Sequence, residues 1–210
     1  MTDDIVDTIA EVTPELDALR RRRPVTREQL QASFDALFRP VSTEHVSRAE
    51  RELVAAFATG LAGAADPTAA FYAARAQEVD PQRAAVVIAE AAAAATAGPF
   101  GTYTELGLQA ENADGVRYVP SETVIAAVGE RLAAALAHTH LLVFRPREAS
   151  VADLGRLLDA GWSTDGIVTL SQLVSFLAFQ QRVVTGLGVL AAAGLTSEIS
   201  DSDDSEEEAA

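Results

Sequence analysis

The sequence predicts an all-α fold, and three observations support this. Hydrophobic residues make up 49% of the 210-residue chain and aromatic residues only 6%, so the core would consist mainly of Ala, Leu and Val, which suit closely packed helices. An Asp-Pro pair typical of a helix start occurs twice, at Asp66-Pro67 and Asp80-Pro81. Residues 160–190 form the longest strongly apolar helical pattern, whereas strand patterns are almost missing.

Capping signals define the expected helices in order, and we expect seven to nine. At most of the expected starts a Ser, Thr or Asp can accept a free backbone N–H, and two capping boxes begin at Thr26 and Ser47. The main predicted helices span residues 13–22, 26–38, 47–61, 66–78, 80–97, 121–137, 150–161 and 163–190. Residues 1–12 are expected to be loosely held. A loop as long as residues 98–120 is more often functional or oligomeric than idle.

The helix predicted after Ser163 should be the centre of the fold. Its apolar residues occupy two neighbouring faces, so we expect it to be covered on most sides and packed against the helix over residues 47–61. Gln181 and Arg182 interrupt the apolar run. A buried arginine needs a partner, because an unpaired charge is costly away from water.

The chain divides into an N-terminal extension with a short helix (1–24), a helical domain (25–195) and an acidic tail (196–210). The formal net charge is −15, and the tail holds seven of the 31 acidic residues and no basic one. An acidic surface disfavours nucleic acid and anionic membranes as partners. Arg20 to Arg23 form the one basic cluster, which we interpret as the solvated end of a helix, with nucleic-acid contact as the less favoured alternative.

Absent features narrow the function classes further. The chain has no cysteine, so it has no disulfide, thiolate metal site or thiol nucleophile. The acidic start MTDDIVD lacks the positive region of a signal peptide. No segment is expected to approach the ~18 uncharged apolar residues of a membrane span. We therefore expect a cytoplasmic protein without a membrane partner.

Two segments resemble a known superfamily. Arg51-Glu-Leu leads through an apolar face to Gly63, and Gly161-Trp-Ser leads to an Asp and a helix that ends in Phe-x-x-Arg-x-x-x-Gly-Leu. In this order and separation they resemble the carboxymuconolactone decarboxylase / alkylhydroperoxidase-D-like superfamily (the CMD superfamily), over roughly residues 25–192. The resemblance implies an alkylhydroperoxidase-D-like helical bundle that forms dimers, trimers or hexamers.

The chain departs from the superfamily at its redox centre. In peroxidase members, Cys-x-x-Cys and then a histidine follow the glycine. One thiolate attacks the peroxide, a second thiol then closes the disulfide with the oxidised cysteine, and the histidine passes protons. Aligned on Gly63, these positions are Ala64, Pro67 and Phe71, or Ala65, Thr68 and Tyr72 one residue later. Thiol peroxidase activity by the family mechanism is therefore excluded. Glu52 matches the family pattern and could supply half of a proton relay.

His138 and His140 form a His-x-His pair. A metal site would need a third ligand, and in the favoured alternative His138 lies at a helix C-terminus and His140 is hydrogen-bonded inside the fold. His140 beside an apolar segment could also act as a general acid or base. Glu52 and His140 are therefore the catalytic candidates, His45 receives no role, and no metal or cofactor is expected.

Several polar residues could bind a substrate. Arg145 could hold a carboxylate through its guanidinium fork, although pairing with Glu148 or Asp153 in a turn is favoured. Arg182 could pair with Glu52, or Gln181 and Arg182 could form the floor of a polar pocket. The loop that ends at Tyr103 could cover such a pocket, although its glycines more simply permit turns.

Two function classes stay open. In the first, the chain is a cysteine-free binding or accessory protein that forms a homo-oligomer and partners a catalytically competent CMD relative. In the second, it is a thiol-independent enzyme of the carboxymuconolactone decarboxylase type, which acts on a small carboxylate or lactone through His and Glu. A cavity shared by Glu52, His140 and Arg182 would favour the enzyme, whereas separate positions would favour the binding class.

Overall fold

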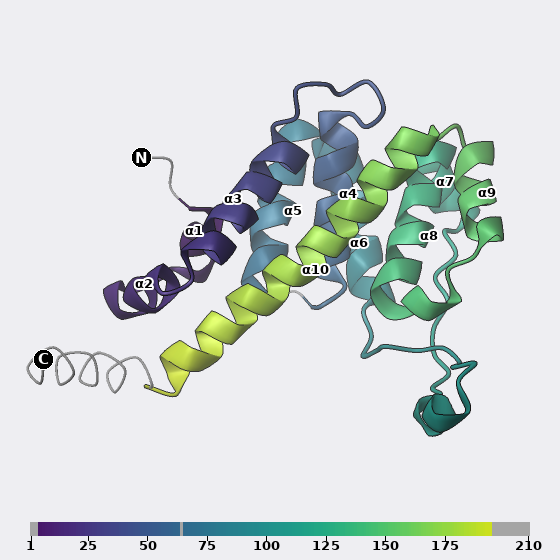
Figure 1. The fold of residues 1–210 in the computed structure, drawn as a ribbon. Coiled ribbons are helices and arrows are strands. Elements are labelled where there is room, and N and C mark those ends of the chain that lie inside the picture. The colour runs from purple at the N-terminus through teal and green to yellow at the C-terminus, as the bar shows by residue number, and fades with distance from the viewer. Residues whose placement is uncertain (1–3, 64, 195–210) are drawn as a thin grey trace, which may run out of the picture.

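The computed structural model describes residues 4–63 and 65–194, and these residues are all-α, as predicted. They form ten α-helices and two short 3-10 helices, and the extended backbone among them pairs only in an isolated bridge between Gly101 and Ala113. In Figure 1, α1 to α3 lie at one end of the bundle, α7 to α9 lie at the other, and α10 crosses the front. The acidic tail predicted over residues 196–210 lies outside the described residues.

The helices follow one another with short connections, except between α6 and α7. In chain order they are α1 (Ile5–Ala10), α2 (Pro14–Arg21), α3 (Pro24–Phe38), α4 (Arg48–Gly60), α5 (Pro67–Val79), α6 (Pro81–Ala94), η1 (Leu106–Glu111), α7 (Glu122–Val128), α8 (Glu130–Phe144), η2 (Pro146–Glu148), α9 (Val151–Asp159) and α10 (Thr164–Ala192).

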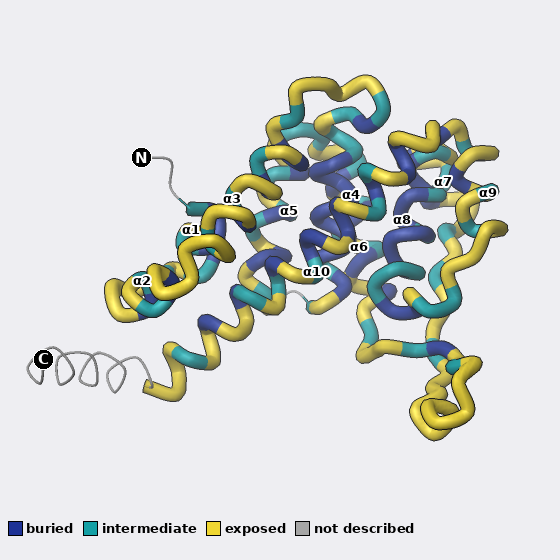
Figure 2. The backbone as a smooth tube through the Cα atoms, viewed as in Figure 1, coloured by how far each residue is buried: buried dark blue, intermediate teal, exposed yellow. Residues whose placement is uncertain are grey.

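The most buried helix is α4, and it packs against α5, α6, α8 and α10. Its predicted capping box forms, with the Ser47 side chain and Glu50 each accepting the other residue's backbone N–H. The predicted contact between α10 and α4 is present, but the prediction that α10 is covered on most sides is wrong. Val168 is 50% exposed and Phe179 45%, because only one face of α10 meets the bundle (Figure 2).

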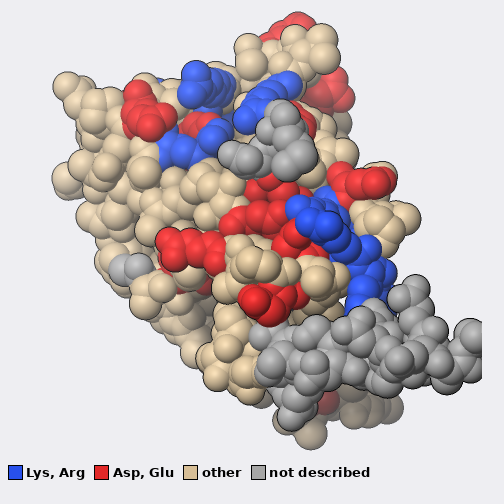
Figure 3. All heavy atoms as spheres, turned by 90° about the vertical axis from the view of Figure 1, so that its left-hand side faces the viewer, with Lys and Arg blue, Asp and Glu red and all other residues tan. Residues whose placement is uncertain are grey.

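The N-terminal residues are held more firmly than predicted. Asp4 caps α1 by accepting from the backbone N–H of Val6 at 2.9 Å, and three α1 side chains are buried. Arg20 is only 8% exposed and pairs with Asp4 at 3.0 Å, so it is not a solvated helix end. Figure 3 shows basic and acidic side chains lying side by side on this end of the molecule. Burial and ion pairing together order α1.

The helix boundaries differ most from the prediction in α3, in α6 and in the helix expected over 121–137. α3 begins at Pro24 and not at Thr26, because proline is already set for the first helical position. α6 ends at Ala94, three residues early. The helix expected over 121–137 is divided at Gly129, whose φ of 87° suits glycine, and α8 then continues to Phe144. This division and the added α1 raise the number of α-helices from the eight listed to ten.

One described helix, α10, has the length and apolar composition of a membrane span. This corrects the expectation that no segment approaches one. The buried side of α10 packs on the bundle, with ten of its 29 residues buried. Core helices of this kind share the composition of membrane spans.

Candidate functional site

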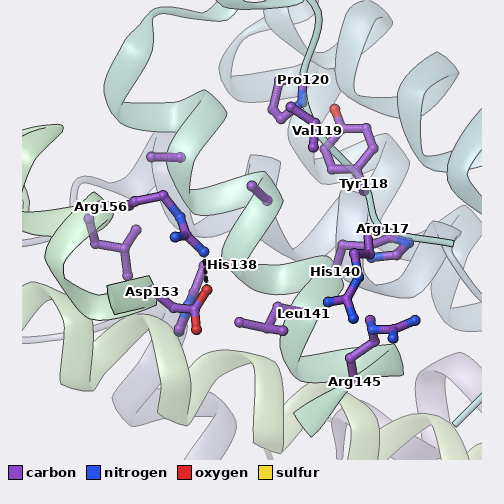
Figure 4. Close-up of a pocket in the computed structure, with 13 residues that line it drawn as sticks. Arg117, Tyr118, Val119, Pro120, His138, His140, Leu141, Arg145, Asp153 and Arg156 are labelled. Atoms are coloured by element: carbon purple, nitrogen blue, oxygen red, sulfur yellow. Dashed lines mark hydrogen bonds and ion pairs between the residues drawn. The ribbon is translucent and has the colours of Figure 1, made fainter. Parts of the chain in front are cut away.

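A cavity of about 360 Å³ lies between α8, α9 and the segment before α7 (Figure 4). Three parts of the chain between Arg117 and Leu157 form its wall. They contribute Arg117, Tyr118, Val119 and Pro120 from the segment, Ala134, Ala137, His138, His140, Leu141 and Arg145 from α8 and its C-cap, and Asp153, Arg156 and Leu157 from α9.

Local sequence explains how α8 presents this wall. Because α8 runs to Phe144, residues 134, 137, 138, 141 and 145 follow steps of three and four and share one helix face. α9 begins with a capping box in which Asp153 accepts the backbone N–H of Ser150 at 2.8 Å. The same Asp153 reaches the cavity, so the cap also positions an acid there.

His140 is a buried, neutral imidazole in this wall. It is 1% exposed, and its Nε2 has no hydrogen-bond partner in the part of the chain that the structure describes. Its ring lies 5.6 Å from that of Tyr118 and 4.9 Å from that of Phe144. Burial lowers the pKa of His140, a backbone hydrogen bond with Ala94 opposes this, and the charge of Arg145 lowers it further. The ring is therefore uncharged at neutral pH.

His138 is also buried and neutral. It is 5% exposed, and neither ring nitrogen has a partner among the described residues. Burial lowers the pKa of His138, the charge of Asp153 opposes the shift, and that of Arg156 adds to it. A neutral imidazole offers one donor and one acceptor, so His138 can bind either kind of group, whereas His140, which also bonds the backbone of Ala94, has only Nε2 free.

The charged residues in the wall are mostly basic, with three arginines against one aspartate. Arg145 is 3% exposed and holds Glu148 with Nε at 2.7 Å and Nη2 at 2.9 Å. Arg117 reaches the same carboxylate at 2.7 Å and is 62% exposed. Hydrogen bonds from Arg145, and then Arg117, lower the pKa of Glu148 to about 2. The fork of Arg145 thus grips a protein carboxylate, whereas Arg117 can turn towards solvent or a ligand.

Glu52 lies away from this cavity. It is 1% exposed on α4 and accepts hydrogen bonds from Arg75 of α5, at 2.9 Å from Nε and 2.5 Å from Nη2. The predicted pair of Glu52 with Arg182 is wrong. Arg182 is exposed and donates to the carbonyl oxygen of Ala178 at 2.8 Å, because its position on α10 faces outward.

The remaining two predicted residues also lie outside the cavity wall. Gln181 donates to the carbonyl oxygen of Thr59 at 3.1 Å and thereby joins α10 to α4. Tyr103 is half-buried, and the guanidinium of Arg147 lies 3.7 Å from its ring centre. Of the six predicted site residues, only His140 and Arg145 share the cavity.

His138 and His140 cannot bind one metal ion together. Both lie inside α8, so the expectation that His138 lies at a helix C-terminus is wrong. Residues that are two positions apart in an α-helix point about 200° apart around its axis, so the two rings lie on different sides of α8. The described residues contain no group of three His, Asp or Glu side chains that could hold a metal.

No sequence pattern had identified Arg117, Tyr118 or Arg156 as site residues, and His138 was expected only at a helix C-terminus. The helical spacing of residues 134, 137, 138, 141 and 145 can be read from the sequence, but the helix was expected to end at Ala137. Arg117 and Arg156 come from segments whose approach to α8 no local pattern indicates.

No protein-family model matches the chain, and no curated protein matches it either.

Proposed function

We propose that this protein binds a small organic molecule in the cavity between α8 and α9. One observation carries the proposal: His138 and His140 line the cavity, are more than nine-tenths buried, and leave three ring nitrogens without a partner among the described residues. An unsatisfied buried polar group costs about 1–3 kcal/mol. A ligand oxygen or N–H that pairs with a nitrogen of either imidazole would offset part of that cost.

The cavity wall supports a small carboxylate with a compact apolar body. Its volume of about 360 Å³ is at the lower end of small-molecule sites. Val119, Leu141 and Leu157 supply apolar wall. Arginine binds carboxylates well, and two lining arginines, Arg117 (62% exposed) and Arg156 (69% exposed), are exposed enough to reach an anionic head.

The class we propose is a binding or accessory protein related to the CMD superfamily, and not a thiol peroxidase. The separate positions of Glu52, His140 and Arg182 support this class over the enzyme. Self-association, a catalytically competent CMD relative as partner, and a cytoplasmic location without nucleic-acid or membrane partners belong to the same proposal. The acidic composition supports the last point.

A second candidate is a thiol-independent enzyme in which His140 is the general base. The neutral buried ring of His140 in a cavity with arginines supports it. Glu52 takes no part, because Arg75 holds it elsewhere. Turnover of a small carboxylated lactone that His140→Gln abolishes, while the variant still binds the substrate, would favour this candidate.

Calorimetric titration with benzoate and its neutral match phenol tests the binding proposal. Ala134→Phe should fill the cavity and abolish binding of both, whereas Ala32→Phe, at an exposed position of α3, should leave binding unchanged. Arg117→Gln should weaken benzoate more than phenol. Binding that survives Ala134→Phe would place the ligand elsewhere and contradict the proposal.

A further inference from the structure

One face of α10 is exposed in a regular pattern. Exposed residues follow alternating steps of three and four from Asp165 to Ala193, and we call the first six, which end at the arginine, the α10 stripe: Asp165, Val168, Gln172, Ser175, Phe179 and Arg182. Such spacing matches the a and d positions of a heptad, which is the seam along which two helices pack. The stripe is about 26 Å long at the helical rise of 1.5 Å per residue.

The stripe is open to a partner. Figure 1 shows α10 at the front of the bundle with no other helix over it. The half-buried residues that flank the stripe include Thr169, Ser171 and Ala178, which are small and uncharged. Between Asp165 and Arg182 the helix carries no charge, in a chain whose formal net charge is −15. This face therefore escapes the repulsion that would oppose contact between two acidic molecules.

The order of residue types in the stripe is self-complementary. From either end it runs charged, apolar, polar, polar, apolar, charged, and the two end charges are opposite. A two-fold axis midway between Gln172 and Ser175 would pair two copies of α10 antiparallel. Val168 would then lie opposite the second copy's Phe179. Such an isologous contact forms every pairing twice.

The charges select the antiparallel arrangement. They would place Asp165 opposite Arg182 of the second copy at both ends of the contact. A parallel pair would instead oppose Asp165 to Asp165 and Arg182 to Arg182, and like charges in close contact are unfavourable. Arg182 has no carboxylate partner within residues 4–63 and 65–194, so it is available for this pairing.

We infer that the α10 stripe is a self-association face that pairs two copies of this chain antiparallel. The inference specifies the face for the self-association proposed above and does not depend on the ligand cavity. It also accounts for two of the three large apolar side chains that α10 exposes, Val168 and Phe179.

Sedimentation velocity across a concentration series tests the face. Phe179→Glu places a charge at both apolar contacts and should weaken the dimer by roughly thirtyfold or more, the effect of losing a central aromatic contact. The matched control is Val25→Glu on α3, which changes another exposed apolar residue (68% exposed) and should leave the dimer intact. A dimer that Phe179→Glu does not weaken would overturn the inference and leave self-association standing.

Charge exchange tests the direction of pairing. Asp165→Arg and Arg182→Asp should each weaken the dimer, because each creates two like-charge contacts. The double variant restores opposite charges at both ends and should recover most of the affinity. Asp165→Arg and the double variant both lose Asp165 from the first turn of α10, so a helix-stability effect of that loss would not be rescued. Failure of the double variant to recover would overturn the antiparallel arrangement.

The absence of native cysteine permits a direct test of register. A mixture of Gln172→Cys and Ser175→Cys proteins should form a disulfide-linked heterodimer on mild oxidation, and Ser33→Cys, on exposed α3, should not join it. A strict monomer at micromolar concentration would refute both this inference and self-association. Binding of monomer to anionic lipid vesicles that Phe179→Glu abolishes would assign the face to membranes and also overturn the inference.

Discussion

Arg75→Leu should destabilise the protein strongly, because it leaves the carboxylate of Glu52 buried without its counter-ion. Glu52 is 1% exposed and takes two hydrogen bonds, at 2.5 and 2.9 Å, from the Arg75 guanidinium. Removing one partner of such a pair costs roughly 3–5 kcal/mol. The Arg75 guanidinium also lies 5.3–5.5 Å from three phenylalanine ring centres, and each such contact contributes about 0.5–1 kcal/mol.

The reverse change should cost less. In Glu52→Leu the unpaired group is Arg75, which is 26% exposed and can turn towards water. We expect a loss on the order of 1–3 kcal/mol. Replacing both residues by leucine removes both charges together and should change the free energy of unfolding little. Replacing a buried ion pair by apolar side chains often has little effect on stability. The double variant should therefore be more stable than Arg75→Leu alone.

Urea unfolding followed by circular dichroism gives these free energies by linear extrapolation. Arg39→Leu is the matched control, since Arg39 pairs with Asp35 at 3.1 Å but is 64% exposed, and such surface pairs contribute about 0–1 kcal/mol. If Arg75→Leu costs no more than Arg39→Leu, the reasoning fails. Glu52 would then be a carboxylate that does not need Arg75, and a catalytic role for it would return to consideration.

Three further outcomes are expected. Burial lowers the folded-state pKa of His138 and His140 below the unfolded value near 6.5. Their contribution to stability is therefore present above pH 6.5 and is lost as the pH falls through 6.5 towards the lowered pKa values. The free energies of unfolding at pH 7.5 and pH 5.5 should differ less in a His138→Leu, His140→Leu variant than in the unmodified protein. Tyr72 donates to Gln180 at 2.7 Å between fully buried side chains, so Tyr72→Phe should cost about 1–3 kcal/mol and clearly less in a Gln180→Leu background, and additive costs would contradict this coupling. The purified protein should show no sustained turnover with a thiol reductant and an organic hydroperoxide, and turnover that persists without bound metal or haem would contradict the cysteine argument.

Residues close together in the chain decided what could be predicted. The Ser47–Glu50 capping box and the N-caps at Asp66 and Ser163 depend on hydrogen bonds within a few residues, and all three form as predicted. The all-α class follows from the same local preferences. The missing thiols, which exclude the peroxidase mechanism, are a matter of composition alone.

Tertiary structure decided which distant residues meet. Arg75 reaches Glu52 across the α4–α5 contact, and Arg182 faces outward, because the packing angle of a helix sets which side of it is buried. The cavity forms only where α8, α9 and the segment around Arg117 come together. The α10 stripe is exposed because the other helices cover only the opposite face of α10. An amphipathic sequence pattern marks a helix that can be buried, but only the packed bundle determines which face is buried and which charges become partners.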